Sequence, residues 1–294
     1  MLKNVAGVWF EGKPATDEWV VRTLDLGNGH KEAVISRPTV WEEMPPHLSA
    51  LFGEHWEASA LRDREEQEEE RKLANLKRAA RRAKTRVRRT VKVLGLDAML
   101  TLTYRANQTD LSLCKKHMKE FVRRMRRALP GFCYVAAFEP QKRGAWHVHM
   151  AIHALPRDLA ACNGVKVKSF NVVRAIWRSV VGELGGNIDQ AKRKRSSRQS
   201  VGKLAAYLSK YMLKAFEEGD DWSNRYSGSA GVEIPDAVRM RFRDAQLAEL
   251  IGLVFDEVAA GVVEVSTWLS RWGDVFYMST ESPPMRPLQP SSGA

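Results

Sequence analysis

Two apolar runs joined by a short turn constrain the fold of this chain more than any other feature. The runs are residues 131–138 and 144–155, and the turn between them contains Pro140 and Gly144. Apolar runs on either side of a short turn with glycine are typical of a β-hairpin. Side chains alternate between the faces of a strand, so His147 and His149 lie on one face and Val148 on the other. We therefore expect an antiparallel pair of strands over residues 132–154.

Further strands and helices are expected on both sides of this hairpin. Residues 97–104 and 187–189 are predicted strands, and residues near 169–184 and 201–216 are predicted helices. Another helix is predicted before Pro130-Gly131, where it should end. Its apolar residues at helical spacing are Cys114, Met118, Phe121, Val122, Met125 and Leu129. The order β-α-β-β-α-β-α predicts an α+β fold, a central antiparallel β-sheet with helices packed on one face.

The remaining parts of the chain are predicted from composition. Residues 1–60 are expected to be a small irregular region, residues 61–94 a charged helical connector, and residues 95–230 the main domain. Residues 231–280 are expected to be helical, with Trp268, Trp272 and Phe276 available to pack on the main domain. Residues 281–294 are expected to be a disordered tail, because they are rich in proline and small polar residues.

Charge points to a polyanionic partner. The chain carries a net charge of +12, and residues 71–92 hold eleven Lys or Arg and no acid. The helix predicted there is either a solvated connector or a surface that contacts nucleic acid, and both readings stay open.

Cysteine usage and hydropathy favour a soluble protein of the cytosol. Cys114, Cys133 and Cys162 are widely spaced, which predicts neither a disulfide framework nor a zinc site. The chain begins without a signal-peptide pattern, and no apolar run approaches the roughly 20 residues of a membrane span.

The two histidines of the hairpin are candidate metal ligands. The preceding run ends at Glu139, so the hairpin can bring a carboxylate close to His147 and His149. One oxygen and two nitrogens suit a divalent metal, Mg²⁺ or Mn²⁺, that keeps positions open for water or substrate. The alternative is that the histidines are structural, and for His153, in phase but further along, a packed or surface position is the preferred reading.

The predicted helix 201–216 carries a second set of candidate catalytic residues. Tyr207 and Tyr211 are four residues apart, as are Lys210 and Lys214, so each pair lies along one helical face. A metal-polarised phosphate permits attack by a phenol, and a nearby lysine stabilises the phenolate. The competing interpretation is core packing by a stripe that includes Leu204, Tyr207, Leu208, Tyr211 and Met212.

Together these segments resemble the HUH endonucleases, in particular the rolling-circle replication initiators of phages and plasmids. Residues 101–104 resemble the first motif, residues 146–150 the metal-binding motif, and residues 207–211 the tyrosine motif. In such proteins an acidic residue of the preceding strand completes the metal site, and Glu139 stands at that position. The resemblance implies nicking of single-stranded origin DNA through a 5′-phosphotyrosine bond, with strand rejoining, and both tyrosines match the two-tyrosine class.

The resemblance also implies partners in a bacterial cytoplasm. No phosphate-loop motif GxxxxGK[ST] occurs, so a host helicase and polymerase would be needed. Candidate DNA contacts are Lys142, Arg143, Lys192, Arg193, Lys194, Arg195 and Arg198. Trp146 could stack on a base, but packing is the preferred interpretation. The alternatives are a non-catalytic DNA- or RNA-binding protein, a metal-dependent hydrolase that activates water, and an HUH relaxase or transposase.

Overall fold

The structure is a computed structural model in which residues 2–50, 64–141, 143–160, 165–190, 200–217, 226–261 and 264–281 are described. Of residues 64–67, 160 and 211–217 only the backbone is described. The chain divides into two compact units. The central unit comprises Leu76–Ile234, and the terminal unit comprises Met1–Asn75 together with Pro235–Ala294. Within the described ranges, every helix is too short or too polar to cross a lipid bilayer.

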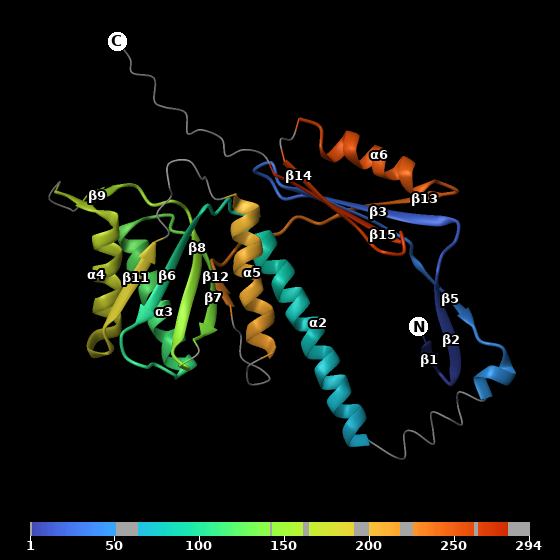
Figure 1. Cartoon of the computed structure of the whole chain (residues 1–294), viewed down its shortest axis with the longest axis horizontal. Coiled ribbons are helices and arrows are strands. Elements are labelled where there is room, and N and C mark those ends of the chain that lie inside the picture. The colour runs from blue at the N-terminus through green and yellow to red at the C-terminus, as the bar shows by residue number, and fades with distance from the viewer. Residues whose placement is uncertain are drawn as a thin grey trace, which may run out of the picture. The chain divides into compact units, whose positions relative to one another are not determined.

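A five-stranded antiparallel sheet forms the middle of the central unit (Figure 1). Its strands follow the order β11-β6-β8-β7-β12. Their bounds are β6 (Ala98–Tyr104), β7 (Tyr134–Pro140), β8 (Trp146–Ile152), β11 (Gly186–Gln190) and β12 (Tyr226–Gly228). The predicted hairpin is confirmed as β7 and β8, which pair from Tyr134↔Ile152 to Pro140↔Trp146.

Four helices cover the sheet, and their bounds are α2 (Arg64–Val93), α3 (Leu111–Ala128), α4 (Ser169–Val181) and α5 (Val201–Glu217). A short 3-10 helix, η1 (Gly182–Leu184), follows α4, and a small hairpin of β9 (Asp158–Ala160) and β10 (Lys166–Lys168) precedes it. The predicted order of strands and helices over residues 97–216 is therefore confirmed.

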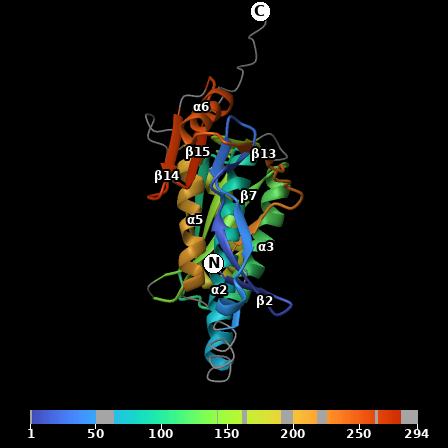
Figure 2. The ribbon, with the colours of Figure 1, turned by 90° about the vertical axis from the view of Figure 1, so that its right-hand side faces the viewer.

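The helices lie on both faces of the sheet, so the expectation that they lie on one face was wrong. Residues of α3 and α4 pack on the face that includes Val148 and Met150. Residues of α2 and α5 pack on the opposite face, around Ala137 and Ala151. Figures 1 and 2 show α3 and α5 on either side of the strands. The cause is the end of β8, where consecutive residues are buried and both faces need an apolar cover.

Trp177 of α4 is the centre of the layer under α3 and α4. Its side chain is fully buried, it donates a hydrogen bond from Nε1 to the Thr103 carbonyl (2.9 Å), and it packs edge-on against Phe121 at 5.8 Å. A Cβ at position 186 would lie 2.6 Å from Trp177 Nε1, so the close packing of β11 on this ring requires the glycine found there.

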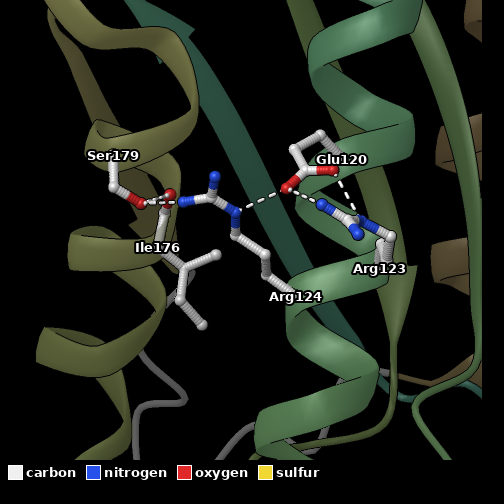
Figure 3. A network of polar contacts seen from close by, with 5 residues as sticks. All are labelled: Glu120, Arg123, Arg124, Ile176 and Ser179. Atoms are coloured by element: carbon white, nitrogen blue, oxygen red, sulfur yellow. Dashed lines mark hydrogen bonds and ion pairs between the residues drawn. The ribbon is translucent and has the colours of Figure 1, made fainter.

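A polar network joins α3 to α4 at the surface of the same layer (Figure 3). Glu120 accepts hydrogen bonds from Arg123 and Arg124, and these guanidinium groups lower the pKa of Glu120 to about 2. Arg124 also donates to Ser179 Oγ at 2.7 Å. Because this network is solvent-exposed, it aligns the two helices more than it stabilises them.

Two local signals explain where α3 begins and how the hairpin turns. Asp110 caps α3, because its side chain accepts hydrogen bonds from the Ser112 and Leu113 amides at 2.7 and 3.2 Å. In the hairpin turn Gly144 has a φ of +84°, a conformation that favours glycine, and its amide donates to the Gln141 carbonyl at 2.8 Å.

The terminal unit holds two antiparallel sheets. The smaller has the order β1-β2-β5, from β1 (Leu2–Val5), β2 (Val8–Pro14) and β5 (Thr39–Glu43). The larger has the order β13-β3-β4-β15-β14, from β3 (Glu18–Asp25), β4 (Lys31–Ser36), β13 (Val238–Arg243), β14 (Glu264–Leu269) and β15 (Val275–Glu281). One helix, α6 (Leu247–Val258), packs on the larger sheet through Leu250, Val254 and Val258 (Figure 1).

This unit differs from the irregular and helical ends expected from sequence. Residues 1–60 contain five strands in the part described, and residues 231–280 contain three strands and one helix. Phe276 is buried in the core of the terminal unit, whereas Trp268 and Trp272 are exposed. Charged residues interrupt the apolar positions of strands such as β3, β4 and β13, so composition does not reveal them. The tail 281–294 lies almost entirely outside the described residues.

The first prediction concerns the α3–α4 layer. Phe121→Ala should lower the free energy of unfolding of the central unit by about 3–5 kcal/mol, because it empties a fully buried aromatic site. Urea denaturation followed by circular dichroism measures this. Lys119→Ala, at an exposed position of the same helix, is the matched control and should change it by less than about 0.5 kcal/mol. Equal effects of the two changes would contradict the assignment of Phe121 to the core.

Candidate active site

The pairing of β7 with β8 places three candidate metal ligands on one face of the sheet. Glu139 is paired directly with His147, and Ala137 with His149. Directly paired residues point to the same side, and so do residues two apart on one strand. Glu139, His147 and His149 therefore share the face opposite to the buried Val148 and Met150.

His149 is held between two polar side chains. Its Nε2 lies 2.9 Å from Oε2 of Glu139, and its Nδ1 lies 3.2 Å from Oγ1 of Thr101 on the neighbouring strand β6. Thr101 is the direct pairing partner of His149. The ring of His147 lies beside the ring of His149, with 6.2 Å between their centroids. Contacts on both nitrogens fix the orientation of the His149 ring.

The surroundings of both imidazoles lower their pKa and so favour the neutral form. Burial lowers the pKa of His149, although the hydrogen bond and charge of Glu139 oppose this. Burial also lowers the pKa of His147, and the nearby His149 and Arg143 lower it further. Neutral imidazole is the form that binds a metal ion, so the environment of the pair favours ligation over protonation.

The donor set suits a divalent metal ion, although its groups now contact one another. Among the residues that the structure describes, no group of three His, Cys, Asp or Glu side chains is already arranged around a common metal position. Glu139 and His149 instead form a direct hydrogen bond, with side chains 20% and 12% exposed. Two neutral imidazoles and a half-buried carboxylate on rigid strands nevertheless match the nitrogen and oxygen ligands of such ions.

Helix α5 packs on the same face as these candidate ligands. Leu204, Ala205 and Leu208 are buried in the cluster that contains Ala137 and Ala151. Ala137 is the pairing partner of His149, and Ala151 follows His149 by two residues on the same face. The helix that carries the tyrosines is thus packed on the face of the sheet that holds the candidate ligands.

The tyrosines differ in what the structure describes. Tyr207 is 46% exposed and Lys210 is also exposed, so neither side chain belongs to the core. Leu204 and Leu208, which belong to the stripe expected to pack in the core, are buried. The backbone of Tyr211 and Lys214 lies within α5, and their side chains are outside the described residues. Tyr104 lies on the opposite, buried face of the sheet, where burial raises the pKa of its phenol and makes it a poor nucleophile.

Among the candidate DNA contacts, the structure describes Arg143. This exposed residue of the hairpin turn donates to the Tyr104 carbonyl at 3.2 Å, and its charge lowers the pKa of His147. It therefore adds positive charge close to the histidines. The other candidates, Lys142, Lys192, Arg193, Lys194, Arg195 and Arg198, lie outside the described residues.

Two readings of aromatic and histidine residues are confirmed. Trp146 packs, since its ring is buried and its Nε1 donates to the Thr109 carbonyl at 2.8 Å. His153 is exposed just beyond the end of β8.

Sequence reasoning did not find two features of this unit. The first is the hydrogen bond from Thr101 to His149, which alternation along β6 could have suggested. The second is a cleft of about 370 Å³ at the sheet edge, between α2 and the chain around β12. Arg86, Thr90 and Tyr226 are among its lining residues, and its described lining includes neither Tyr207 nor the candidate metal ligands. Only the packing of α2 against the sheet creates this cleft.

A comparison with known families bears on this part of the chain. Residues 97–216 match the family model of the replication-associated protein ORF2/gene 2 protein. The match begins just before β6 and ends within α5, so it includes the hairpin and the tyrosine helix but less than half of the chain. It supports a role in replication and, with it, an interaction with DNA. No curated protein and no solved structure gives a significant match.

The contacts of His149 generate the second prediction. In metal-free protein both imidazoles should titrate below about 6.5, the ordinary histidine value, because burial disfavours their charged forms. Glu139→Gln should lower the midpoint of His149 further, since the carboxylate that stabilises the imidazolium is removed. Histidine NMR titration measures both midpoints. Glu120→Gln, which removes a carboxylate on α3, is the control, and a rise at His149 in Glu139→Gln would contradict the assigned contact.

Proposed function

We propose that the central unit nicks and rejoins single-stranded DNA at a replication origin and thereby starts rolling-circle replication. The observation that carries this proposal is the packing of α5 on the sheet face that holds Glu139, His147 and His149. A carboxylate, two neutral imidazoles and an exposed phenol thereby lie on one side of a single sheet. The match of residues 97–216 to replication-associated proteins supports the same role.

In this mechanism Glu139, His147 and His149 hold a divalent ion, Mg²⁺ or Mn²⁺. When bound, that ion supplies charge neutralisation to the scissile phosphate. The contact with Thr101 keeps His149 in one orientation, and the low pKa of both imidazoles keeps their nitrogens available.

The nucleophile is a tyrosine of α5, Tyr207 or Tyr211. Its phenolic oxygen releases a proton to solvent and forms a bond to phosphorus, while the bond from phosphorus to the 3′ oxygen breaks and that oxygen takes up a proton from solvent. The products are a free 3′ hydroxyl and a 5′-phosphotyrosine bond to the protein. An ordinary phenol has a pKa near 10, so the positive charges of Lys210 and Lys214 are assigned to stabilise the phenolate.

Strand rejoining is the reverse of this step. Attack of a 3′ hydroxyl on the phosphotyrosine restores the phosphodiester without an added energy source, because the covalent bond retains the free energy of the broken linkage. A second tyrosine four residues away allows a second cleavage while the first remains linked. Tyr207 and Tyr211 thus match a two-tyrosine scheme.

The DNA backbone is assigned to basic side chains around this face. Arg143 contributes charge beside His147, and Lys142, Lys192, Arg193, Lys194, Arg195 and Arg198 belong to the same proposal from their place in the sequence. Such contacts bind phosphates without reading bases. A host helicase and polymerase would complete replication.

The covalent intermediate generates the third prediction. Purified protein with Mn²⁺ should form an adduct with a pool of single-stranded oligonucleotides of randomised sequence, and a label at the 3′ end should remain with the protein on a denaturing gel. Tyr207→Phe combined with Tyr211→Phe should abolish the adduct, since no nucleophile is left. Tyr226→Phe on β12 is the matched control and should leave it unchanged. Cleavage without an adduct would indicate a hydrolase that uses activated water. An adduct in the double variant would show that neither Tyr207 nor Tyr211 is the nucleophile.

The candidate metal ligands generate the fourth prediction. His147→Ala should lower the rate of adduct formation at least about 100-fold, a larger loss than removal of a group that only supports a ligand. DNA affinity, measured by fluorescence anisotropy, should change little, because the imidazole serves the reaction. His153→Ala, beyond the end of the same strand, is the control. Wild-type adduct formation by His147→Ala would refute the metal site, and equal loss of binding would assign the histidine to DNA contact.

A further inference from the structure

A single row of side chains crosses all five strands of the larger sheet in the terminal unit. Consecutive strands pair directly as Arg239↔Arg22, Arg22↔Val34, Val34↔Tyr277 and Tyr277↔Trp268. Directly paired residues of antiparallel strands point to the same side, so all five side chains share one face. With a strand spacing of about 4.8 Å, the row is about 19 Å long.

This face is the one that α6 leaves uncovered. Helix α6 packs on Trp19, Val21, Ala33, Ile35 and other residues that alternate with those of the row. Arg22 and Arg239 are exposed, Trp268 is 57% exposed, and Val34 and Tyr277 are half-buried. Val20 and Leu24, which flank Arg22 on the same side of β3, are buried. On β3, Arg22 is therefore the exposed position of this face.

One end of the row concentrates positive charge. Arg22 and Arg239 are directly opposite one another, an arrangement of like charges that destabilises a sheet unless an anion lies near both. Arg22 donates a hydrogen bond to Ser36 at 3.4 Å, whereas the next arginine of β13 on this face, Arg241, is paired with Glu18 at 3.3 Å. Two guanidinium groups at directly paired positions are within reach of one phosphate group, which guanidinium binds by paired hydrogen bonds.

The other end of the row is aromatic. Tyr277 and Trp268 are direct neighbours across β15 and β14, and Val34 separates them from the arginines. Aromatic rings on an exposed sheet face are a surface on which unpaired bases stack, whatever their identity. The basic end suits phosphates and the aromatic end suits bases, the two kinds of group that a single strand offers together.

We propose that this row binds single-stranded DNA, as a second nucleic-acid site separate from the candidate ligands and tyrosines of the central unit. Arg22 and Arg239 contact the phosphates, and Tyr277 and Trp268 stack on bases. Binding at this site requires no metal ion and no cleavage. It can therefore be tested independently of the nicking reaction.

The test uses the full chain and a fluorescein-labelled oligothymidylate about 16 nucleotides long, the upper end of what one such surface covers. Trp268→Ala should weaken binding, measured by fluorescence anisotropy, at least about fivefold, the lower end of the effect of losing one stacked base. The dependence of affinity on salt should stay unchanged in this variant, because no charge is removed. Affinity for a blunt duplex of the same length should also stay unchanged, since its bases are already stacked.

Removal of the two arginines should instead change the dependence of affinity on salt. Arg22→Gln combined with Arg239→Gln should lower the slope of log affinity against log salt by about 1.4, the contribution of two phosphate contacts on a single strand. Two matched controls come from the smaller sheet of the same unit. Trp41→Ala removes an aromatic ring that is 40% exposed, and Lys13→Ala removes an exposed positive charge. Neither should change the affinity.

Three results would overturn the proposal. The first is an affinity of Trp268→Ala equal to that of Trp41→Ala. The second is a salt slope of the arginine variant equal to that of the wild type. The third is a variant of the row that loses self-association, measured by light scattering, but keeps its DNA affinity. That result would assign this face to contact with a second copy of the chain. Circular dichroism melting of each variant must match the wild type, and Trp268→Phe, which keeps a ring, should restore most of the affinity if stacking is the cause.

Discussion

The register between β7 and β8 is the constraint on which the rest of the central unit depends. The same pairing that sets Glu139 opposite His147 also places Val148 and Met150 in the core beneath α3 and α4. A slip of one residue would exchange the two sets, burying the imidazoles and exposing the core. The free energy of packing therefore enforces the arrangement of the candidate site. Gly144 contributes to the same register, because its positive φ permits the short turn between the strands.

The candidate site combines partial burial with internal hydrogen bonding. Burial alone would leave a carboxylate and two imidazoles without water, at a cost in stability. The contacts of His149 with Glu139 and Thr101 offset that cost, while burial still lowers the pKa of both histidines. A divalent ion would have to replace the direct contact between Glu139 and His149. Under the proposed function, metal binding would therefore be linked to the loss of the hydrogen bond between Glu139 and His149.

Much of the central unit could be predicted because its signals are local. The period-two pattern of residues 146–152 and the helical spacing from Cys114 to Met125 identify their elements without tertiary information. The face on which α5 packs could not be predicted, since Ala137 and Ala151 make the second face apolar as well. In the terminal unit the larger sheet depends on pairings between strands far apart in sequence, β13 with β3 and β15 with β4. The Lys31 amide donates to Thr280 Oγ1 across 249 positions of sequence, and no local pattern predicts such a pairing.

The proposed roles of the two units follow from what nicking demands of a strand. In the proposed reaction the tyrosine attacks single-stranded DNA, and the chain carries no phosphate-loop motif with which to unwind a duplex. Unpaired DNA must then be stabilised by binding, and stacking on exposed aromatic rings distinguishes a single strand from a duplex, whereas charge alone does not. The described residues around Glu139, His147 and His149 offer charge at Arg143 but bury Trp146. On this face of the central unit Tyr207 is exposed but is assigned to cleavage, whereas the row ending in Tyr277 and Trp268 offers aromatic rings without that role. A division between a unit that cleaves and a unit that holds the strand open is therefore the arrangement that these side chains support best.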